Sequence, residues 1–138
     1  MKPTEEQIKE MAELLGCGQI CYFHSPSGRI EHHADPDNEY FDPGAWQGNI
    51  DRIEADWENY QRFEKMDSRQ SFRVMEDFAE TVTEIGFRSR LLGLLSGPRP
   101  FSKFKRAIDS SRYRQDWFAF KERAYINWVH QQIEGQFG

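Results

Sequence analysis

The strongest constraint on the fold is a change in the spacing of apolar residues along the chain. After residue 67 they recur every three or four positions with charged residues between them, as in Phe72, Met75, Phe78, Val82 and Ile85. Such a stripe is typical of an amphipathic helix. The earlier segment 19–33 instead places aromatic and β-branched residues on both sides of a Ser-Pro-Ser-Gly turn, which is typical of a hairpin. The pattern therefore predicts an α+β fold.

The first 66 residues are predicted to hold a helix, the hairpin and an acidic loop. Thr4 and Gln7 form a capping box before an apolar stripe, which predicts a helix over 4–15 that stops at Gly16. In the hairpin, Ile20, Tyr22 and His24 share one face of the first strand. Residues 35–48 are rich in Asp, Pro, Gly and Asn and predict an irregular loop, in which Pro43 opens a turn or a helix. A helix reaching residue 56 or 59 follows, and 60–66 supplies a third strand.

The rest of the chain is predicted to be helical. Asp67 or Ser68 caps a helix that runs through Ile85 and stops at Gly86. Three further helices are expected over 87–95, 100–108 and 113–133. The last is apolar over more than half of its circumference, so we expect other elements to pack around it. Together these elements predict one domain, 1–138, in which a small antiparallel sheet packs with a mostly helical C-terminal region that begins at residue 67.

Cysteine content and hydropathy predict a cytoplasmic protein. Cys17 and Cys21 are too few for a disulfide scaffold and fit a reducing compartment. The N-terminus carries acidic residues where a signal peptide needs an apolar segment, and no run approaches the ~18 apolar residues of a membrane span. The two cysteines with His24, His32 and His33 suggest zinc, but a Cys-x3-Cys spacing without a second close pair argues against it. We expect buried structural thiols, and neither a metal nor another cofactor.

Charge is distributed unevenly. Residues 1–60 hold 4 Lys and Arg against 13 Asp and Glu, whereas residues 88–123 hold 10 against 3, in a chain of net charge −5. The candidate binding residues therefore lie in the second segment: Arg88, Arg90, Arg99, Lys103, Lys105 and Arg106. On a helical wheel Phe101, Phe104 and Ile108 point inward, and Lys103 and Arg106 fall about 200 and 140 degrees from Phe101. The basic groups should therefore face solvent, and base stacking on these rings is not expected.

Two arrangements of these charges compete. The acidic first sixty residues could cover the basic helices, within one molecule or between two copies in a homo-oligomer. Alternatively the basic surface stays open and attracts an anionic partner. We expect a non-catalytic interaction or regulatory module that contacts an acidic protein through its Arg- and Lys-rich surface in 88–114, with the acidic loop 35–42 as a second candidate. Binding of RNA or single-stranded nucleic acid is the alternative.

Catalytic motifs are not evident in the sequence. It has no Gly-x-Ser-x-Gly and no phosphate-binding glycine loop, and Ser110 and Ser111 lack spaced His and Asp partners. Glu76 and Glu80 lie one turn apart, but Arg69 and Arg73 share their face, so an exposed ion-pair network is expected there. A second alternative is an enzyme with a site between hairpin and helices that uses His24, His32 or Tyr22. His24 and Glu31 are predicted to face each other across the hairpin.

Several blocks of the C-terminal half resemble a known family. The blocks are Asp67-Ser-Arg with Phe72-Arg-Val-Met-Glu-Asp-Phe78, then Arg90-Leu and Leu94-Leu95, then Phe101 with Phe104-Lys105, and finally Trp117-Phe-Ala-Phe120. Their order and spacing over 67–128 resemble uncharacterised protein family 0158, a group of small bacterial proteins. Nearer the N-terminus, a strand, a turn with Gly28 and a second strand look similar. The resemblance implies no catalytic residue, because the family has no assigned activity.

Overall fold

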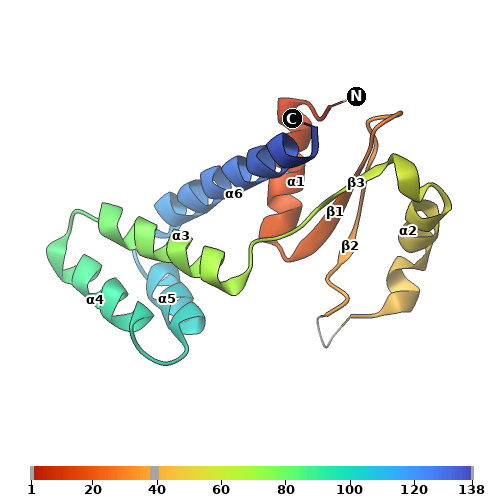
Figure 1. Ribbon diagram of the computed structural model, residues 1–138. Coiled ribbons are helices and arrows are strands. Elements are labelled where there is room, and N and C mark those ends of the chain that lie inside the picture. Colours follow the sequence, from red (N-terminus) through yellow and green to blue (C-terminus); the bar gives the residue numbers. More distant parts are fainter. Residues whose placement is uncertain (1, 38–40, 138) are drawn as a thin grey trace. The chain divides into compact units, whose positions relative to one another are not determined.

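The computed structural model describes residues 2–37 and 41–137 (Figure 1). The chain divides into two compact units, which we call unit 1 (1–65 with 125–138) and unit 2 (66–124). Within the described residues there are six α-helices and one three-stranded antiparallel sheet. The predicted α+β class is therefore confirmed. None of the helices in the described part is both long and apolar enough to cross a membrane.

Helix α1 (Glu5–Gly16) begins at the predicted capping box. The Thr4 hydroxyl accepts a hydrogen bond from the Gln7 backbone N–H, and the Gln7 side chain accepts one from the Thr4 N–H. These two bonds satisfy N–H groups that a helix start otherwise leaves unpaired. The helix buries an apolar stripe that includes Ile8, Met11 and Leu15. The predicted first helix is confirmed.

The sheet has the strand order β2-β1-β3, with β1 (Gln19–His24) in the middle. Strands β2 (Ile30–Ala34) and β3 (Tyr60–Phe63) both pair with it antiparallel. Alternation along β1 sends Cys21 and Phe23 toward one face and Ile20 and Tyr22 toward the other. On the Cys21 face the thiol lies 3.9 Å from the carbonyl oxygen of Met11 in α1. Tyr22 and Ile20 instead cluster with Ile53 of α2 and Tyr60 of β3.

The third strand is confirmed but is shorter than predicted. It ends at Phe63 rather than at residue 66, because side chains of helix α6 (Arg114–Phe137) bind the backbone that follows. The Glu64 N–H donates to Gln132 Oε1, and the Glu64 carbonyl accepts from Gln132 Nε2 and Trp128 Nε1. Backbone groups that would extend the strand are thus paired with a helix.

The predicted irregular loop over 35–48 is wrong in its second half, where the predicted alternative of a helix that opens at Pro43 is confirmed. Helix α2 (Pro43–Ala55) already begins at Pro43, and a short 3-10 turn (Trp57–Asn59) follows it. Asp42 caps α2 by accepting a hydrogen bond from the Gly44 N–H, and proline suits the first helical position, which needs no N–H donor. Of the predicted loop, residues 38–40 lie outside the described residues.

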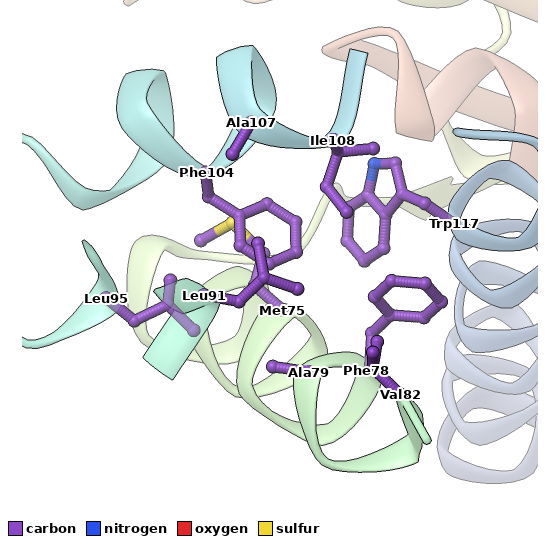
Figure 2. Packing of buried hydrophobic residues seen from close by; sticks show 10 residues of the cluster. All are labelled: Met75, Phe78, Ala79, Val82, Leu91, Leu95, Phe104, Ala107, Ile108 and Trp117. Atoms are coloured by element: carbon purple, nitrogen blue, oxygen red, sulfur yellow. The ribbon is translucent and has the colours of Figure 1, made fainter. Parts of the chain in front are cut away.

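Unit 2 consists of α3 (Ser68–Thr81), α4 (Ile85–Leu95), α5 (Pro100–Asp109) and the first part of α6. The apolar stripes of these helices meet in one core, shown in Figure 2. Trp117 of α6 packs into this core, with its ring centroid 5.3 Å from that of Phe78 and 5.1 Å from that of Phe104, both in edge contact. Such aromatic pairs add specific geometry to the burial of large apolar surfaces. The expectation that elements pack around the last helix holds for Trp117.

The first helix of unit 2 ends earlier than predicted. The sequence predicts a helix through Ile85 that stops at Gly86, but α3 ends at Thr81 and Gly86 lies inside α4. Val82 adopts an extended conformation, with a ψ of 120°, and is buried. The Thr81 hydroxyl donates to the Phe78 carbonyl oxygen and so takes up one of the helix's terminal acceptors. Ile85 was assigned to the buried stripe but is 69 % exposed.

The two remaining helical predictions are confirmed with small shifts in their ends. Helix α5 starts at Pro100, as predicted, after Arg99 in the left-handed conformation with a φ of 51°. Helix α6 extends beyond the predicted 113–133 to Phe137. It contributes residues to both units. The prediction of a single domain stays a prediction.

Candidate functional site

The predicted binding residues lie on α4, on α5 and in the turn between them. We call this set the cationic surface: Arg88 and Arg90 of α4, Arg99 of the turn, and Lys103, Lys105 and Arg106 of α5. The structure describes every residue of unit 2, and within that unit none of the six side chains forms an ion pair or a hydrogen bond. Their positive charges are therefore not neutralised by neighbouring carboxylates of unit 2.

Two other arginines of the same basic segment do have partners. Arg112 Nη2 lies 3.3 Å from a carboxylate oxygen of Glu84, and Arg114 Nε lies 3.5 Å from one of Asp109. The Arg114 guanidinium also lies over the Phe118 ring, 4.9 Å from its centroid. Because they have these partners, we do not include Arg112 and Arg114 in the cationic surface.

Lys105 and Arg106 are brought together in one open depression on the outer side of α5. Its lining residues are Ser102, Lys105, Arg106, Asp109 and Ser110. At about 100° per residue, Lys103 projects from the opposite flank of the helix to Lys105, and its side chain is half-buried. Lys105 and Arg106 are both exposed and line this depression together.

The predicted inward orientation is confirmed for Phe104 and wrong for Phe101. Phe104 is 1 % exposed, whereas Phe101 is 43 % exposed. Phe101 lies in the first turn of α5, at the edge of the face that carries the buried Phe104, Ala107 and Ile108. It also lies one helical turn before Lys105, on the same side of the helix. An apolar ring therefore borders the cationic surface.

The predicted ion-pair network on α3 is wrong. Arg69, Arg73, Glu76 and Glu80 are all exposed, as expected. Within unit 2, which is described throughout, none of them forms an ion pair. Side-chain entropy opposes holding long exposed side chains in one geometry, so helical spacing alone does not produce a salt bridge.

The hairpin histidines have separate partners. His32 Nδ1 is hydrogen-bonded to Gln19 Oε1, and its ring contacts Trp46. His33 contacts the Tyr22 hydroxyl through Nε2 at 3.3 Å and the Ala34 carbonyl through Nδ1 at 2.8 Å. Burial raises the pKa of Tyr22. Within the described residues, no three His, Cys, Asp or Glu side chains are placed to hold a metal ion.

His24 binds Ser27 and Asp56 instead of the predicted Glu31. Strand pairing places Glu31 opposite Tyr22, so His24 lies two residues farther along, next to the hairpin turn. His24 Nδ1 is 2.6 Å from Ser27 Oγ, and His24 Nε2 is 2.6 Å from Asp56 Oδ2. The hydrogen bond from His24 lowers the pKa of Asp56, and a further bond from Asn59 acts in the same direction. Asp56 is therefore a carboxylate at neutral pH.

Glu31 is a buried carboxylate with separate partners, two half-exposed arginines. Arg52 of α2 donates from Nε to Oε1 at 2.9 Å and from Nη2 to Oε2 at 3.1 Å. Arg29 lies 3.2 Å from Oε1. The Arg52 hydrogen bonds hold the pKa of Glu31 below its ordinary value. Two parallel bonds of this kind fix α2 against β2.

The two cysteines differ in their surroundings. Cys17 caps the C-terminus of α1 and is exposed, so the prediction that both thiols are buried is wrong for it. Cys21 is fully buried, and burial raises the pKa of its thiol to about 12. A thiol in that state is a poor nucleophile and a poor metal ligand.

Comparison with known proteins gives one family. The sequence matches the uncharacterised protein family UPF0158 over residues 38–136, which is most of the chain. The chain belongs to this family. The UPF0158 match includes the whole cationic surface, and it begins after the β1–β2 hairpin. Searches of curated proteins and of solved structures found no match.

Sequence reasoning did not find Ser27 and Asp56. Ser27 belongs to the Ser-Pro-Ser-Gly turn that predicted the hairpin, and His24 was a candidate as one of the hairpin histidines. Asp56 lies 32 positions after His24, and no spacing signal connects the two. His24 and Asp56 meet because the end of α2 lies next to the hairpin turn.

Proposed function

We propose that this UPF0158 member is an interaction module that binds an acidic partner protein through its cationic surface. The supporting observation is the absence of polar partners for six basic side chains within unit 2, next to Arg112 and Arg114, which have them. Guanidinium groups suit carboxylates because they donate two parallel hydrogen bonds. Binding of this kind requires no catalytic step.

Phe101 adds a reason for a protein partner. Protein interfaces are enriched in aromatic residues and arginine, and a few such residues supply most of the binding energy. Phe101 is exposed on the same side of α5 as Lys105. The partner is therefore expected to present carboxylates around an apolar contact.

The test uses a fluorescently labelled, glutamate-rich peptide and the whole chain 1–138. We expect binding that weakens as salt rises, because exposed charges are screened. The double variant K105E/R106E should bind roughly tenfold more weakly, since it replaces two attractions with repulsions. Fluorescence anisotropy over a salt series measures both effects.

The matched control is R69E/R73E. It makes the same change in net charge on α3, where both arginines are exposed and have no ion pair within unit 2. We expect this variant to bind the peptide like the wild type. Equal losses in the two double variants would show that net charge, and not the cationic surface, attracts the peptide. Equal binding by the wild type and K105E/R106E would contradict the proposal.

A second candidate function is the binding of single-stranded RNA. It is favoured by the exposed ring of Phe101 beside Lys105, since single strands bind where bases stack on aromatic rings next to basic groups. Labelled single-stranded RNA in the same assay, with Phe101→Ala as the variant, distinguishes the candidates. RNA binding that exceeds peptide binding and that Phe101→Ala removes would favour this second function.

We propose that the protein is cytoplasmic, as the sequence predicts. Both cysteines are free thiols, and Cys17 is exposed. An exposed thiol is suited to a reducing compartment, where it is not drawn into disulfides.

A further inference from the structure

A serine, a histidine and a carboxylate form a chain of two hydrogen bonds beside the turn of the β1–β2 hairpin. Ser27 Oγ is 2.6 Å from His24 Nδ1, and His24 Nε2 is 2.6 Å from Asp56 Oδ2. The three side chains belong to unit 1. A nucleophile within hydrogen-bond reach of a base, with that base oriented by a third group, is the arrangement that activates a serine.

Hydrogen bonds from the backbone fix the direction of proton transfer. The Ser27 N–H points at His24 Nδ1 at 3.3 Å, so Nδ1 is the acceptor nitrogen of the neutral ring. The ring proton is then on Nε2 and is donated to the Asp56 carboxylate. The Arg29 N–H donates to Ser27 Oγ at 3.2 Å. The Ser27 hydroxyl therefore has its own proton free to donate to Nδ1.

We propose that Ser27 is an activated nucleophile that attacks esters and other activated acyl compounds, with His24 as its general base and Asp56 as the group that orients the imidazole. The general-base role requires one ring nitrogen to face the hydroxyl and the other to face the carboxylate. Nothing in the acidic-partner proposal depends on this site, which therefore adds an activity to it.

Exposure supports access to the serine. Ser27 is exposed, whereas the His24 side chain is only 11 % exposed and lies against the Tyr60 ring, with centroids 4.8 Å apart. The Asp56 side chain is 47 % exposed and is held by a 2.7 Å hydrogen bond from Asn59. A reagent can thus reach the hydroxyl while the base stays fixed. Since water also reaches the site, slow turnover is expected, and covalent modification is the sharper readout.

The chemical step is simple to write for an ester. Ser27 Oγ forms a bond to the acyl carbon, its proton passes to His24 Nδ1, and the bond to the alcohol oxygen breaks. The alcohol leaves after taking the proton from His24. Water then attacks the acyl-serine with His24 again as base, which releases the carboxylic acid and restores Ser27.

The test is stoichiometric labelling of the whole chain 1–138 with a fluorophosphonate. Phosphorus bonds to Ser27 Oγ, fluoride leaves with its electron pair, and the hydroxyl proton passes to His24. We expect one adduct by intact mass and its location at Ser27 by peptide mass spectrometry. Ser27→Ala should abolish the adduct, and His24→Gln should slow its formation roughly 100-fold.

Two further variants keep the result interpretable if His24→Gln fails to fold. Asp56→Asn retains a hydrogen-bonding side chain at an exposed position and should slow labelling at least tenfold, with circular dichroism unchanged. Ser25→Ala, in the same turn but without a bond to His24, should label like the wild type. Labelling of Ser27 at the same rate in Asp56→Asn, or no labelling of Ser27 in the wild type, would overturn the proposal. K105E/R106E should label normally, which separates this site from the cationic surface.

Discussion

Glu31 shows how a single buried charge is stabilised in unit 1. Its side chain is 8 % exposed, and Arg52 supplies two hydrogen bonds to it. Desolvation alone would favour the protonated acid, but the Arg52 bonds outweigh it and the pKa is lowered. A glutamate with a lowered pKa in the folded state stabilises the fold above its ordinary titration range. That stabilisation is lost as the pH falls through the lower folded-state value.

We therefore predict that Glu31→Gln destabilises the chain at neutral pH and has little effect at acidic pH. Hydrogen bonds to charged groups contribute about 1.5–3 kcal/mol each, and Arg52 can rehydrate when its partner is lost, so a loss of about 1–2 kcal/mol is expected at pH 7. Urea unfolding of both proteins over a pH series measures the difference. Glu54→Gln, at an exposed position of α2, is the control. A difference that persists unchanged under acid would contradict the ion-pair account.

Residue types were easier to predict than residue partners. The sequence identified His24 and Glu31 as titratable groups in the hairpin, and both are buried there. The predicted pairing of His24 with Glu31 was wrong because cross-strand neighbours depend on the register of the two strands. In the observed register Glu31 lies opposite Tyr22, two residues before His24. The partners they do have, Asp56 and Arg52, come from the end of α2, which sequence spacing does not place.

At the scale of elements, α6 is linked to the sheet by its side chains. Gln132 pairs with both backbone groups of Glu64, and Gln136 Nε2 donates to the Arg62 carbonyl at 2.8 Å. Strand β3 is at the edge of the sheet, and an unpaired strand edge is prone to association with other chains. The amide side chains of α6 therefore both stabilise β3 and protect its edge.

We predict that Gln132→Leu reduces stability by about 1 kcal/mol, because it removes two hydrogen bonds at a half-buried position. Gln131→Leu is the matched control, since Gln131 is exposed on the same helix and makes no hydrogen bond to the backbone of 60–64. Thermal unfolding compares the two, and light scattering on heating reports association through the strand edge. Equal melting temperatures for Gln132→Leu and Gln131→Leu would contradict this role of α6.

Helix starts that carry a capping residue in the sequence were predicted well. The predicted capping box of Thr4 and Gln7 forms, and Asp67, one of the two predicted caps of α3, forms a second capping box with Gln70. The end of α3 has no comparable signal. Apolar spacing continues through Val82 and Ile85, and the chain leaves the helix because Val82 is buried in the core in an extended conformation. Tertiary packing decided that boundary, and local propensity did not.

At the scale of the whole molecule, the spacing of apolar residues and the uneven charge were the features that could be predicted from sequence. The α+β class followed from the change in apolar spacing, which depends on burial and is visible in one sequence. The candidate residues of the cationic surface were chosen from sequence, since a basic segment in an acidic chain is a property of composition, and their binding role stays a prediction. The link between Ser27, His24 and Asp56 was not, because it joins a turn to the end of a distant helix.

Each unit has its own buried residues. We predict that a destabilising substitution in one unit reduces the protection of backbone amides against hydrogen exchange in that unit alone. Leu91 is fully buried in unit 2, and Met11 is fully buried in unit 1. Truncating a buried leucine or methionine to alanine costs about 2–5 kcal/mol. Leu91→Ala should therefore speed amide hydrogen exchange in 66–124 while β1 and β3 keep their protection. Met11→Ala should show the reverse.

The shared helix α6 makes this test informative. Trp117 belongs to the core of unit 2, whereas Trp128, Gln132 and Gln136 bind the backbone at and after β3. If the units lose protection separately, Leu91→Ala should expose amides of α6 before residue 125 and spare those after it. Equal acceleration along all of α6 and in the sheet would instead show one cooperative domain, as the sequence predicts. Hydrogen exchange followed by mass spectrometry resolves the two halves of α6 and so decides between them.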